Sequence, residues 1–556
     1  MINLFFVLHF IAQLGGPLTN PDLDWKTRST AHFRIHYPSE LEDVASRYQK
    51  IVEPIHEKMT KDMGWNPSGP VHLVLLNNTD SANGLSTPLP YNAIYLNIAP
   101  PQVASSLDNY DDWLTMLFVH EYTHTIHIDM AEGWNRSARN IFGRTVLPNA
   151  IQPQWLIEGY AIFNETNYTT QGRGRSSFVE MQLREAALQN LWPPISRATY
   201  WNNQYPYGQA AYWYGIGFYQ YVAKEYGNQV WADFAKINAA WITPGWFNFK
   251  TKVLLGKSFN RLWNEWNVSQ VEYWTNEQSK YKTRTDFKKF NDENLKILSQ
   301  GCYSKDSNSI YAVVEDEKKA RSLRVWTADE NSETWKSETL SKFFPAVDLV
   351  CASGKLLFSK SSPFKNYDFY SDLWEFDLET KKQKQLTFGA RLNFPTFFKD
   401  RIFAVHTQAL LSKIVEVFKA SDAEAYETKV IFEPDATAQI SQLRISPDGQ
   451  KIAFIMKKKN EFQDVFTLEI DNQKLKRITQ NPRLEYFPQW QSNSEIVYTA
   501  DHELPNTQSR VFNVFQQKIG SSEAKALTDT WSGIFWPLVT PNKVLIGRFE
   551  KEAFEF

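Results

Sequence analysis

Two histidines four residues apart are the residues of this chain best suited to chemistry. His120 and His124 flank Glu121 in an H-E-x-x-H pattern, and the apolar residues around them include no glycine or proline. Such a run predicts a buried helix, on which residues i and i+4 lie on the same face. Both imidazoles can then bind one metal ion, with Glu121 beside them as general base for a bound water. We therefore predict a Zn²⁺ site that serves hydrolysis.

A catalytic zinc takes three protein ligands, so a third must come from elsewhere in the chain. Pro153 is placed to begin a second helix, because its missing N–H costs nothing in the first turn. Glu158 falls inside this helix and is the candidate third ligand, whereas Glu165 is expected on another face. Gly159 costs a helix about 1 kcal/mol relative to alanine, and a close approach of two backbones would explain it.

Two other residues compete with Glu158 as supports or ligands of the metal. His127 follows His124 by three residues and shares its helical stripe. Three histidines on one straight helix do not surround an ion tetrahedrally, so His127 is expected to line the cleft, support the ligands or sit in the core. Asp129 is a weaker candidate for the same supporting role.

The two segments together resemble a known group of enzymes. H-E-x-x-H followed by W-L-x-E-G-x-A at Trp155–Ala161 is similar to the gluzincin (peptidase MA-like) zinc metallopeptidases, which include aminopeptidase N-like and thermolysin-like enzymes. The resemblance implies zinc ligands at His120, His124 and Glu158. One departure is the spacing, because 33 residues separate His124 from Glu158 where the family has about twenty. The excess, around Glu132–Gln152, is interpreted as an insertion between the two helices.

A tyrosine-rich segment extends the resemblance. Tyr212, followed by Gly215, is similar in order and spacing to the Y-x-K-G helix of aminopeptidase N-like enzymes, with Tyr214 in place of the lysine. The family tyrosine donates a hydrogen bond to the oxyanion of the tetrahedral intermediate, and this role maps onto Tyr212. Tyr207 and Tyr214 are rival donors.

The substrate cleft is expected to be lined by an edge strand within Asn83–Leu96. Aminopeptidase N-like enzymes carry a G-x-M-E-N segment here, whose glutamate binds the free amine of the substrate, but this chain has only neutral side chains. An extended peptide could pair with Ile94–Leu96 as an added strand. We therefore expect endopeptidase action on a peptide or protein substrate.

Composition limits the remaining classes of function. The chain has 556 residues, a net charge of −2 and no basic run, which excludes nucleic acid as the partner. Its two cysteines, Cys302 and Cys351, are expected to be buried thiols. Residues 1–20 resemble a signal peptide and predict export to the periplasm or medium of a bacterium. No later segment is apolar for long enough to span a membrane.

Two domains are expected after the signal peptide. Residues 21–285 contain strand patterns at His32–Tyr37 and Val71–Leu76 around a helix from about Glu40 to Met63, followed mainly by helical patterns. This order is that of an α+β zincin-like metallopeptidase domain. Lys280–Asn294 is charged, lacks apolar periodicity and is interpreted as the linker.

Residues 286–556 repeat with a period of about 46 residues, the length of one four-stranded propeller blade. Apolar strand cores recur at Ile310–Ala312, Leu356–Phe358, Ile402–Ala404, Ile452–Phe454 and Ile496–Tyr498. At matching offsets the chain has Leu340-Ser341, Leu386-Thr387, Ile478-Thr479 and Leu527-Thr528.

The segment Ile445–Phe454, with its Pro447-Asp448-Gly449 turn, resembles the repeat of TolB-like β-propellers. Five blades are expected, and Trp531–Phe556 supplies about half of a sixth. The ring then closes with a strand borrowed from elsewhere, or the chain stops short of its natural end. We expect the second, with an incomplete last blade.

These features predict an exported bacterial zinc metallopeptidase with a C-terminal TolB-like β-propeller. Zn²⁺ would be held by His120, His124 and Glu158, Glu121 would be the general base and Tyr212 would bind the oxyanion. The propeller would select or present substrate and could bind a protein partner on its face. The alternative is an envelope scaffold in which the propeller is the working part and the zincin domain is inactive.

Overall fold

The computed structural model describes residues 19–241, 245–282, 285–290, 295–315, 321–328, 335–346, 348–419, 426–550 and 553–556. The predicted signal peptide lies outside the described residues except for Thr19 and Asn20. The chain divides into two compact units, one of Met1–Glu272 with Lys365–Asp368 and one of Tyr273–Phe364 with Phe369–Phe556. Among the described residues, no helix is long and apolar enough to cross a membrane.

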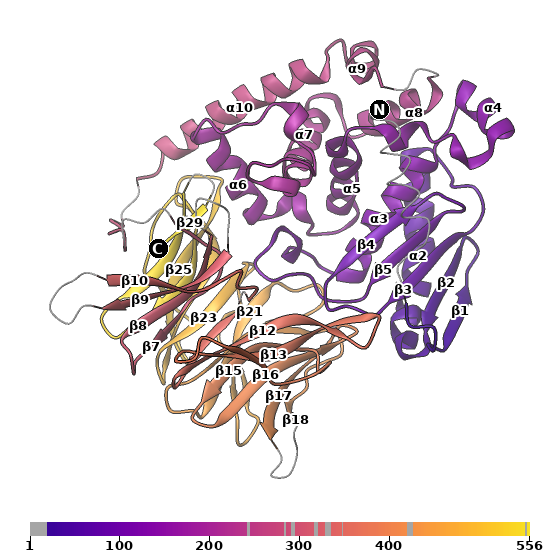
Figure 1. Cartoon of the computed structure of the whole chain (residues 1–556). Coiled ribbons are helices and arrows are strands. Elements are labelled where there is room, and N and C mark those ends of the chain that lie inside the picture. The colour runs from indigo at the N-terminus through magenta and orange to yellow at the C-terminus, as the bar shows by residue number, and fades with distance from the viewer. Residues whose placement is uncertain are drawn as a thin grey trace. The chain divides into compact units, whose positions relative to one another are not determined.

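Unit 1 is built on a mixed sheet whose strand order is β1-β2-β3-β5-β4 (Figure 1). Its strands are β1 (Trp25–Ser29), β2 (Phe33–Pro38), β3 (Val71–Leu76), β4 (Asn83–Thr87) and β5 (Ala93–Asn97). The central strands β2, β3 and β5 run parallel, and β1 and β4 pair antiparallel at the two edges. The two strands and the helix predicted at the start of this domain are confirmed to within two residues at each end.

Helices supply the rest of unit 1. They are α2 (Glu42–Met63), α3 (Trp113–Asp129), α4 (Gly133–Phe142), α5 (Gln154–Tyr168), α6 (Ser177–Leu188), α7 (Ala210–Tyr226), α8 (Val230–Ala240), α9 (Phe247–Leu255) and α10 (Phe259–Ser279), the last of which continues into unit 2. Helix α3 packs against α2, α5 and the strands β4 and β5. It is buried along almost its whole length, because its apolar residues cover every face.

Unit 2 consists of antiparallel sheets of blade size, five of which follow one another along the chain. These five are β7 (Cys302–Ser304), β8 (Ser309–Glu315), β9 (Arg321–Ala328) and β10 (Trp335–Lys342); β11 (Leu349–Ala352), β12 (Lys355–Phe364), β13 (Asp368–Asp377) and β14 (Gln383–Gln385); β15 (Leu392–Phe398), β16 (Arg401–Gln408), β17 (Leu411–Lys419) and β18 (Tyr426–Phe432); β19 (Gln439–Ile445), β20 (Lys451–Lys457), β21 (Gln463–Glu469) and β22 (Leu475–Arg477); β23 (Glu485–Ser492), β24 (Glu495–Glu503), β25 (Arg510–Lys518) and β26 (Ala524–Ala526). The predicted apolar cores form the second strand of each.

The sixth sheet corrects the expectation of an incomplete last blade. Its strands β27 (Ile534–Val539), β28 (Val544–Glu550) and β29 (Ala553–Glu555) are joined by β6 (Lys296–Ile297), which precedes the first blade in sequence. Ile297 pairs with Phe554, and β6 also pairs with β8, so β6 joins the sixth blade and the first into one eight-stranded sheet. The first strands of successive blades contact one another, and β27 contacts β7, so the six blades form a closed ring.

The recurring threonines of the sequence pattern join two strands within a blade. Thr387, Thr479 and Thr528 each accept a hydrogen bond from a backbone N–H of the third strand, at distances of 2.8–3.0 Å. Each of these threonines lies just after the short fourth strand of its blade. Their repetition at one structural position explains the spacing seen in the sequence.

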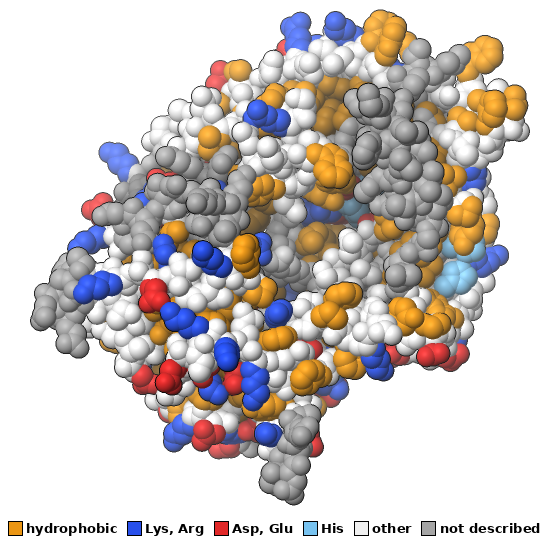
Figure 2. All heavy atoms as spheres, viewed as in Figure 1, with side chains coloured by type: hydrophobic (Ala, Val, Ile, Leu, Met, Phe, Trp, Pro, Cys, Tyr) orange, Lys and Arg blue, Asp and Glu red, His pale blue; other side chains and the backbone are white. Residues whose placement is uncertain are grey.

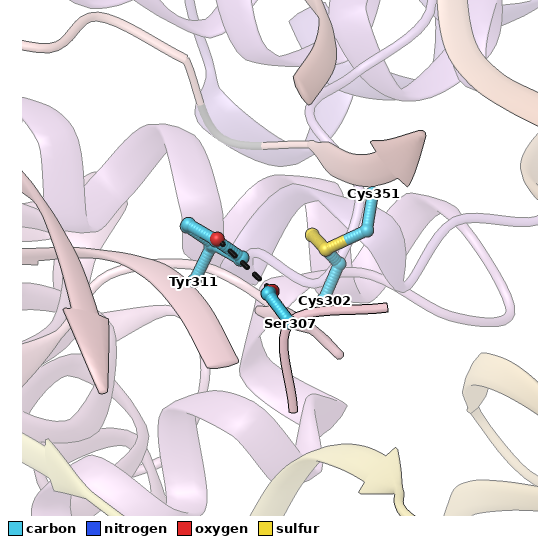
Figure 3. Close-up of a disulfide and its surroundings, with 4 residues drawn as sticks. All are labelled: Cys302, Ser307, Tyr311 and Cys351. Atoms are coloured by element: carbon cyan, nitrogen blue, oxygen red, sulfur yellow. Dashed lines mark hydrogen bonds between the residues drawn. A yellow bond between two sulfur atoms is a disulfide. The ribbon is translucent and has the colours of Figure 1, made fainter. Parts of the chain in front are cut away.

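The prediction that both cysteines are thiols is wrong, because Cys302 and Cys351 form a disulfide (Figure 3). Cys302 lies in β7 and Cys351 in β11, and these are neighbouring first strands of adjacent blades. Their Cα atoms are 5.6 Å apart, a usual separation for a disulfide. The ring brings together two residues that are 49 positions apart in sequence.

Removing this disulfide should destabilise unit 2. Replacing both cysteines with serine is expected to lower its free energy of unfolding by about 2–4 kcal/mol, because the crosslink closes a 49-residue loop in the unfolded chain. Urea unfolding followed by circular dichroism measures the change. A reducing agent should shift the wild-type midpoint and leave the serine variant unaffected; equal shifts in both proteins would contradict the prediction.

The predicted linker at Lys280–Asn294 is also corrected in its described part. Tyr281 is buried, and Thr285 Oγ1 accepts a hydrogen bond from the backbone N–H of Asp529 at 2.8 Å. The ring of Phe290 lies 5.1 Å from that of Trp335. This stretch therefore packs on the sheets of unit 2, because Phe287 and Phe290 are partly buried against its apolar clusters and alternate with charged residues.

Candidate metal centre

Helix α3 brings the two histidines of the H-E-x-x-H pattern together. Asp112 caps its first turn by accepting a hydrogen bond from Leu114 N at 3.2 Å. Two turns on, the buried rings of His120 and His124 lie with their Nε2 atoms 3.2 Å apart. The predicted helix and the shared face of the two imidazoles are confirmed.

Helix α5 supplies Glu158, and its position depends on two glycines. Helix α5 begins next to Pro153, as predicted, although Pro153 is the residue that precedes the first turn and not a member of it. A Cβ atom on Gly159 would lie 3.0 Å from the carbonyl carbon of Gly215 in α7, and one on Gly215 would lie 3.1 Å from the Cα of Gly159. The close approach of two backbones predicted from Gly159 is thus confirmed. It brings α7, which carries Tyr212, against the helix that carries Glu158.

The side chains of His120, His124 and Glu158 converge on one point. Oε2 of Glu158 lies 3.3 Å from Nε2 of His120 and 3.5 Å from Nε2 of His124. All three residues are buried, and their candidate ligand atoms lie within 4.8 Å of one another. A tetrahedral zinc with ligands at about 2.0–2.1 Å holds its ligand atoms about 3.3 Å apart. Both the donor types and their spacing therefore fit Zn²⁺.

A carboxylate on the same helix face supports His120 from behind. Nδ1 of His120 lies 2.5 Å from Oε1 of Glu165, and Glu165 also forms a buried ion pair with Arg173. Burial opposes a charge on His120, but hydrogen bonds with Glu158 and Glu165 outweigh it and raise its pKa to about 9. Partners of this kind orient metal-binding histidines. His124 Nδ1 has no hydrogen-bond partner among the residues that the structure describes.

The expectation that Glu165 lies on another face is wrong. Residues i and i+7 of a helix share a face, and Glu165 follows Glu158 by seven residues. This spacing was the signal in the sequence for a second carboxylate in the site. Arg173 carried no such signal, because it lies in the short helical turn Arg173–Arg175 after α5.

Glu121 is held beside the histidines by the edge strand β4. Oγ of Ser86 lies 3.0 Å from Oε2 of Glu121 and donates a hydrogen bond to its backbone carbonyl at 2.7 Å. A Cβ atom on Gly84 would overlap the Glu121 carboxylate, so only glycine leaves room for it there. The strand thus fixes the carboxylate that the sequence marks as a base.

The edge of the sheet is not where the sequence placed it. Ile94–Leu96 was expected to accept an added strand, but β5 is already paired on both sides, with β3 and β4. In the described sheet β4 is the edge, and Asn83, Gly84, Leu85 and Ser86 line the cavity of the site. The Pro88–Tyr91 segment folds the chain back and moves β4 outside β5.

Two tyrosines lie at the site, and the sequence pointed to one of them. Tyr212 lines the cavity, and burial together with the charge of Glu158 raises its pKa. Tyr200, which sequence reasoning missed, donates a hydrogen bond to Oε1 of Glu158, and its ring lies 5.7 Å from that of Tyr212. It is 42 residues from Glu158 and lies in no recognisable motif. The rival donors Tyr207 and Tyr214 are not among the described residues that line the cavity.

His127 and Asp129 do not approach the three converging atoms. The ring of His127 packs edge-on against Tyr160 with centroids 5.2 Å apart, and burial lowers its pKa to about 3. Asp129 is fully buried, where it accepts hydrogen bonds from Trp65 at 3.0 Å and Arg144 at 2.8 Å. Both are therefore structural residues of the fold, and Asp129 anchors the insertion that contains Arg144.

The converging side chains open onto a cavity of about 1230 Å³ within unit 1. Most of its lining is neutral, and many of the residues are apolar. The large apolar side chains in the lining are those of Leu85, Leu107, Trp113, Met116, Leu117, Ile128, Ile157, Phe178, Trp201 and Trp213. The charged residues among the described lining are Glu121, Glu158, Glu165 and Arg173. A cavity of this size accommodates several residues of an extended peptide.

Comparison with known proteins gives distant likenesses. No family model matches the chain. A curated protein of Treponema pallidum (strain Nichols), described as an uncharacterized protein, is 26% identical over 204 residues, which make up 36% of this chain and 18% of that protein. The matched part is thus less than a fifth of that relative.

Three solved structures are among those with a distant likeness to this chain. TolB from Acinetobacter baumannii has a TM-score of 0.32 and 15% identity, and the match covers 44% of this chain and 62% of TolB. The β-propeller domain of the Trilobed protease from Pyrococcus furiosus has a TM-score of 0.30 and 15% identity over 43% of this chain and 69% of that one. Puromycin hydrolase has a TM-score of 0.33 and 11% identity, and the match covers 49% of this chain and 44% of that one.

Proposed function

We propose that unit 1 is a zinc-dependent peptidase of the gluzincin type. The observation that carries this proposal is the spacing of 3.2–3.5 Å between Nε2 of His120, Nε2 of His124 and Oε2 of Glu158. Two histidines and one glutamate are the protein ligands of the thermolysin-type catalytic zinc site. A general base beside the set, at Glu121, is what distinguishes a hydrolytic site from a purely structural one.

The residues of the site divide the work of hydrolysis among them. Zn²⁺, when bound, would lower the pKa of a water molecule and polarise the scissile carbonyl. Glu121, oriented by Ser86, would accept the proton of the attacking water and return it to the leaving amine. Tyr212 would donate a hydrogen bond to the developing oxyanion, and Tyr200 would orient Glu158. Arg173 and Glu165 would keep the His120 ring in place.

An extended substrate would bind along the edge strand β4. Backbone groups of an unpaired edge can hydrogen-bond to a peptide whatever its side chains are. A free amino terminus would need a carboxylate of its own, since burying an unpaired ammonium is costly. Of the described cavity carboxylates, Glu158 and Glu165 are engaged with the histidines and Glu121 is the base. This arrangement supports our proposal of endopeptidase cleavage.

The remaining proposals concern the location and the second unit. We propose export to the periplasm or medium of a bacterium, which the disulfide Cys302–Cys351 supports, because disulfides persist in oxidising compartments. The closed ring of blades would select or present the substrate and could bind a protein partner.

Paired peptides test the peptidase and its mode of cleavage together. Zinc-loaded protein should hydrolyse casein, and 1,10-phenanthroline should stop the reaction until zinc is restored. A peptide with a free amino terminus and its N-acetylated copy should be cut at similar rates.

Different results would point to different errors. Slowing by more than about tenfold on acetylation, or roughly 1.4 kcal/mol of transition-state binding, would show an amine anchor and contradict the endopeptidase proposal. Absence of any hydrolysis by zinc-loaded protein would favour the alternative in which the propeller is the working part.

A further inference from the structure

The insertion between α3 and α5 folds as a helix whose polar side faces the protein. Nδ2 of Asn135 in α4 donates hydrogen bonds to the carbonyls of Ala239 at 2.9 Å and Trp241 at 2.8 Å. Arg139, one turn later, donates to Val146 O and pairs with the buried Asp129. The insertion is therefore fastened to unit 1 by polar contacts, the reverse of the usual arrangement for a surface helix.

The apolar side of α4 faces solvent. Trp134 is 71% exposed, Ile141 77% and Phe142 67%. Because they occupy positions i, i+7 and i+8, these side chains form one stripe along the helix. A solvent-facing stripe of large apolar residues needs a covering partner.

Helix α9 extends the same kind of surface. Trp246, which immediately precedes α9 (Phe247–Leu255), is 63% exposed, Phe249 is 47% exposed and Val253 59%. Helices α4 and α9 both pack on α8, and the ring of Trp241, whose carbonyl binds Asn135, lies 5.6 Å from that of Phe249. Figure 2 shows hydrophobic side chains at the surface over the elements that Figure 1 labels α4 and α9.

The charges of these helices are of one sign. Helix α4 carries Arg136 and Arg139, α9 carries Lys250 and Lys252, and neither contains an aspartate or glutamate. Arg136 and Lys252 are exposed beside the apolar residues. Tryptophan and phenylalanine flanked by cations are the composition of a helix that lies in the interface of an anionic membrane.

We propose that α4 and α9 form a membrane-binding face that inserts Trp134, Ile141, Phe142, Trp246, Phe249 and Val253 into the headgroup region of an anionic bilayer. A second copy of the chain fits this face less well. A two-fold interface places a patch against itself, so Arg136 and Lys252 would meet like charges. A bilayer containing anionic lipid attracts the same cations and covers the apolar stripe.

Flotation of the full-length protein with lipid vesicles tests the proposal. Vesicles that contain phosphatidylglycerol should bind the wild type, and replacing Trp134, Ile141 and Phe142 together with serine should weaken binding by about tenfold or more. The double change Arg136→Gln and Lys252→Gln should weaken binding to these vesicles and leave the weaker binding to pure phosphatidylcholine unchanged. The matched control is Phe343→Ser with Phe388→Ser, which removes two exposed aromatic side chains from unit 2.

A fluorescent label locates the contact directly and is independent of other parts of the chain that bind lipid. A nitrobenzoxadiazole group on Ile141→Cys should shift to the blue with anionic vesicles, and the same group on Phe343→Cys should not. An unshifted label, or equal flotation of the wild type and the triple variant, would overturn the proposal. A dimer that becomes monomeric in the triple variant, without lipid binding, would overturn it in favour of self-association.

Discussion

Replacing Glu121 with glutamine is expected to abolish peptide hydrolysis and to leave the zinc content of the protein unchanged. Glutamine keeps the size of the side chain and its contact with Ser86, but it cannot accept a proton. A general base contributes about a hundredfold to ten-thousandfold to the rate. Casein hydrolysis and metal analysis of the same preparation measure the two effects.

The control for this experiment is a glutamate that is exposed on α7. Glu225→Gln should retain both zinc and activity, because Glu225 does not line the cavity. Loss of zinc from Glu121→Gln would show that Glu121 is itself a ligand. Full activity of that variant would remove the proposed role of the base.

Replacing Glu158 with alanine should lower zinc binding more than replacing a residue that only supports a ligand. This substitution removes one of the three converging atoms, whereas Glu165→Gln changes only the partner of His120 Nδ1. Loss of such a supporting partner costs metal affinity by about 10–100-fold. Zinc affinity is expected to be highest in Glu225→Ala, lower in Glu165→Gln and lowest in Glu158→Ala.

Competition with a chelating dye measures these affinities, and thermal unfolding without metal shows whether each variant is folded. Glu165→Gln removes the carboxylate that pairs with the buried guanidinium of Arg173. The unfolding temperature of this variant should therefore fall even without zinc. Equal zinc affinity of Glu158→Ala and Glu225→Ala would contradict the proposed ligand set.

The local features of the site could be predicted from the sequence, because they depend on short-range periodicity. A helical spacing of four placed His120 and His124 on one face, and the misfit of Gly159 in a helix indicated a neighbouring backbone. The seven-residue spacing between Glu158 and Glu165 also predicts a shared helix face, but Glu165 was wrongly expected on another face. The contact between Tyr200 and Glu158 could not be predicted from periodicity, because Tyr200 lies in a loop between α6 and α7.

Features that depend on the closure of a sheet could not be predicted. Strand β4 precedes β5 in sequence but lies outside it at the edge of the sheet. The residue pattern of each strand would be the same if their positions were reversed. The disulfide requires that two blades be neighbours. Closure with a borrowed strand was one of the two alternatives, but no pattern in the sequence identified β6 as that strand. Hydrophobic alternation identifies a strand and says nothing of which other strand pairs with it.

The strand β6 sets the order in which unit 2 can acquire its structure. Hairpins within each blade join residues that are close in sequence and can form early, but the pairing of Ile297 with Phe554 joins residues 257 positions apart, since 554 − 297 = 257. Contacts over such a separation form slowly, because the entropy of closing the loop is lost before the pairing stabilises it. Until then the edges of the first and last sheets stay open to other chains. Propeller folding is therefore completed only after Phe554 has been synthesised, and the interval before closure is when aggregation competes with folding.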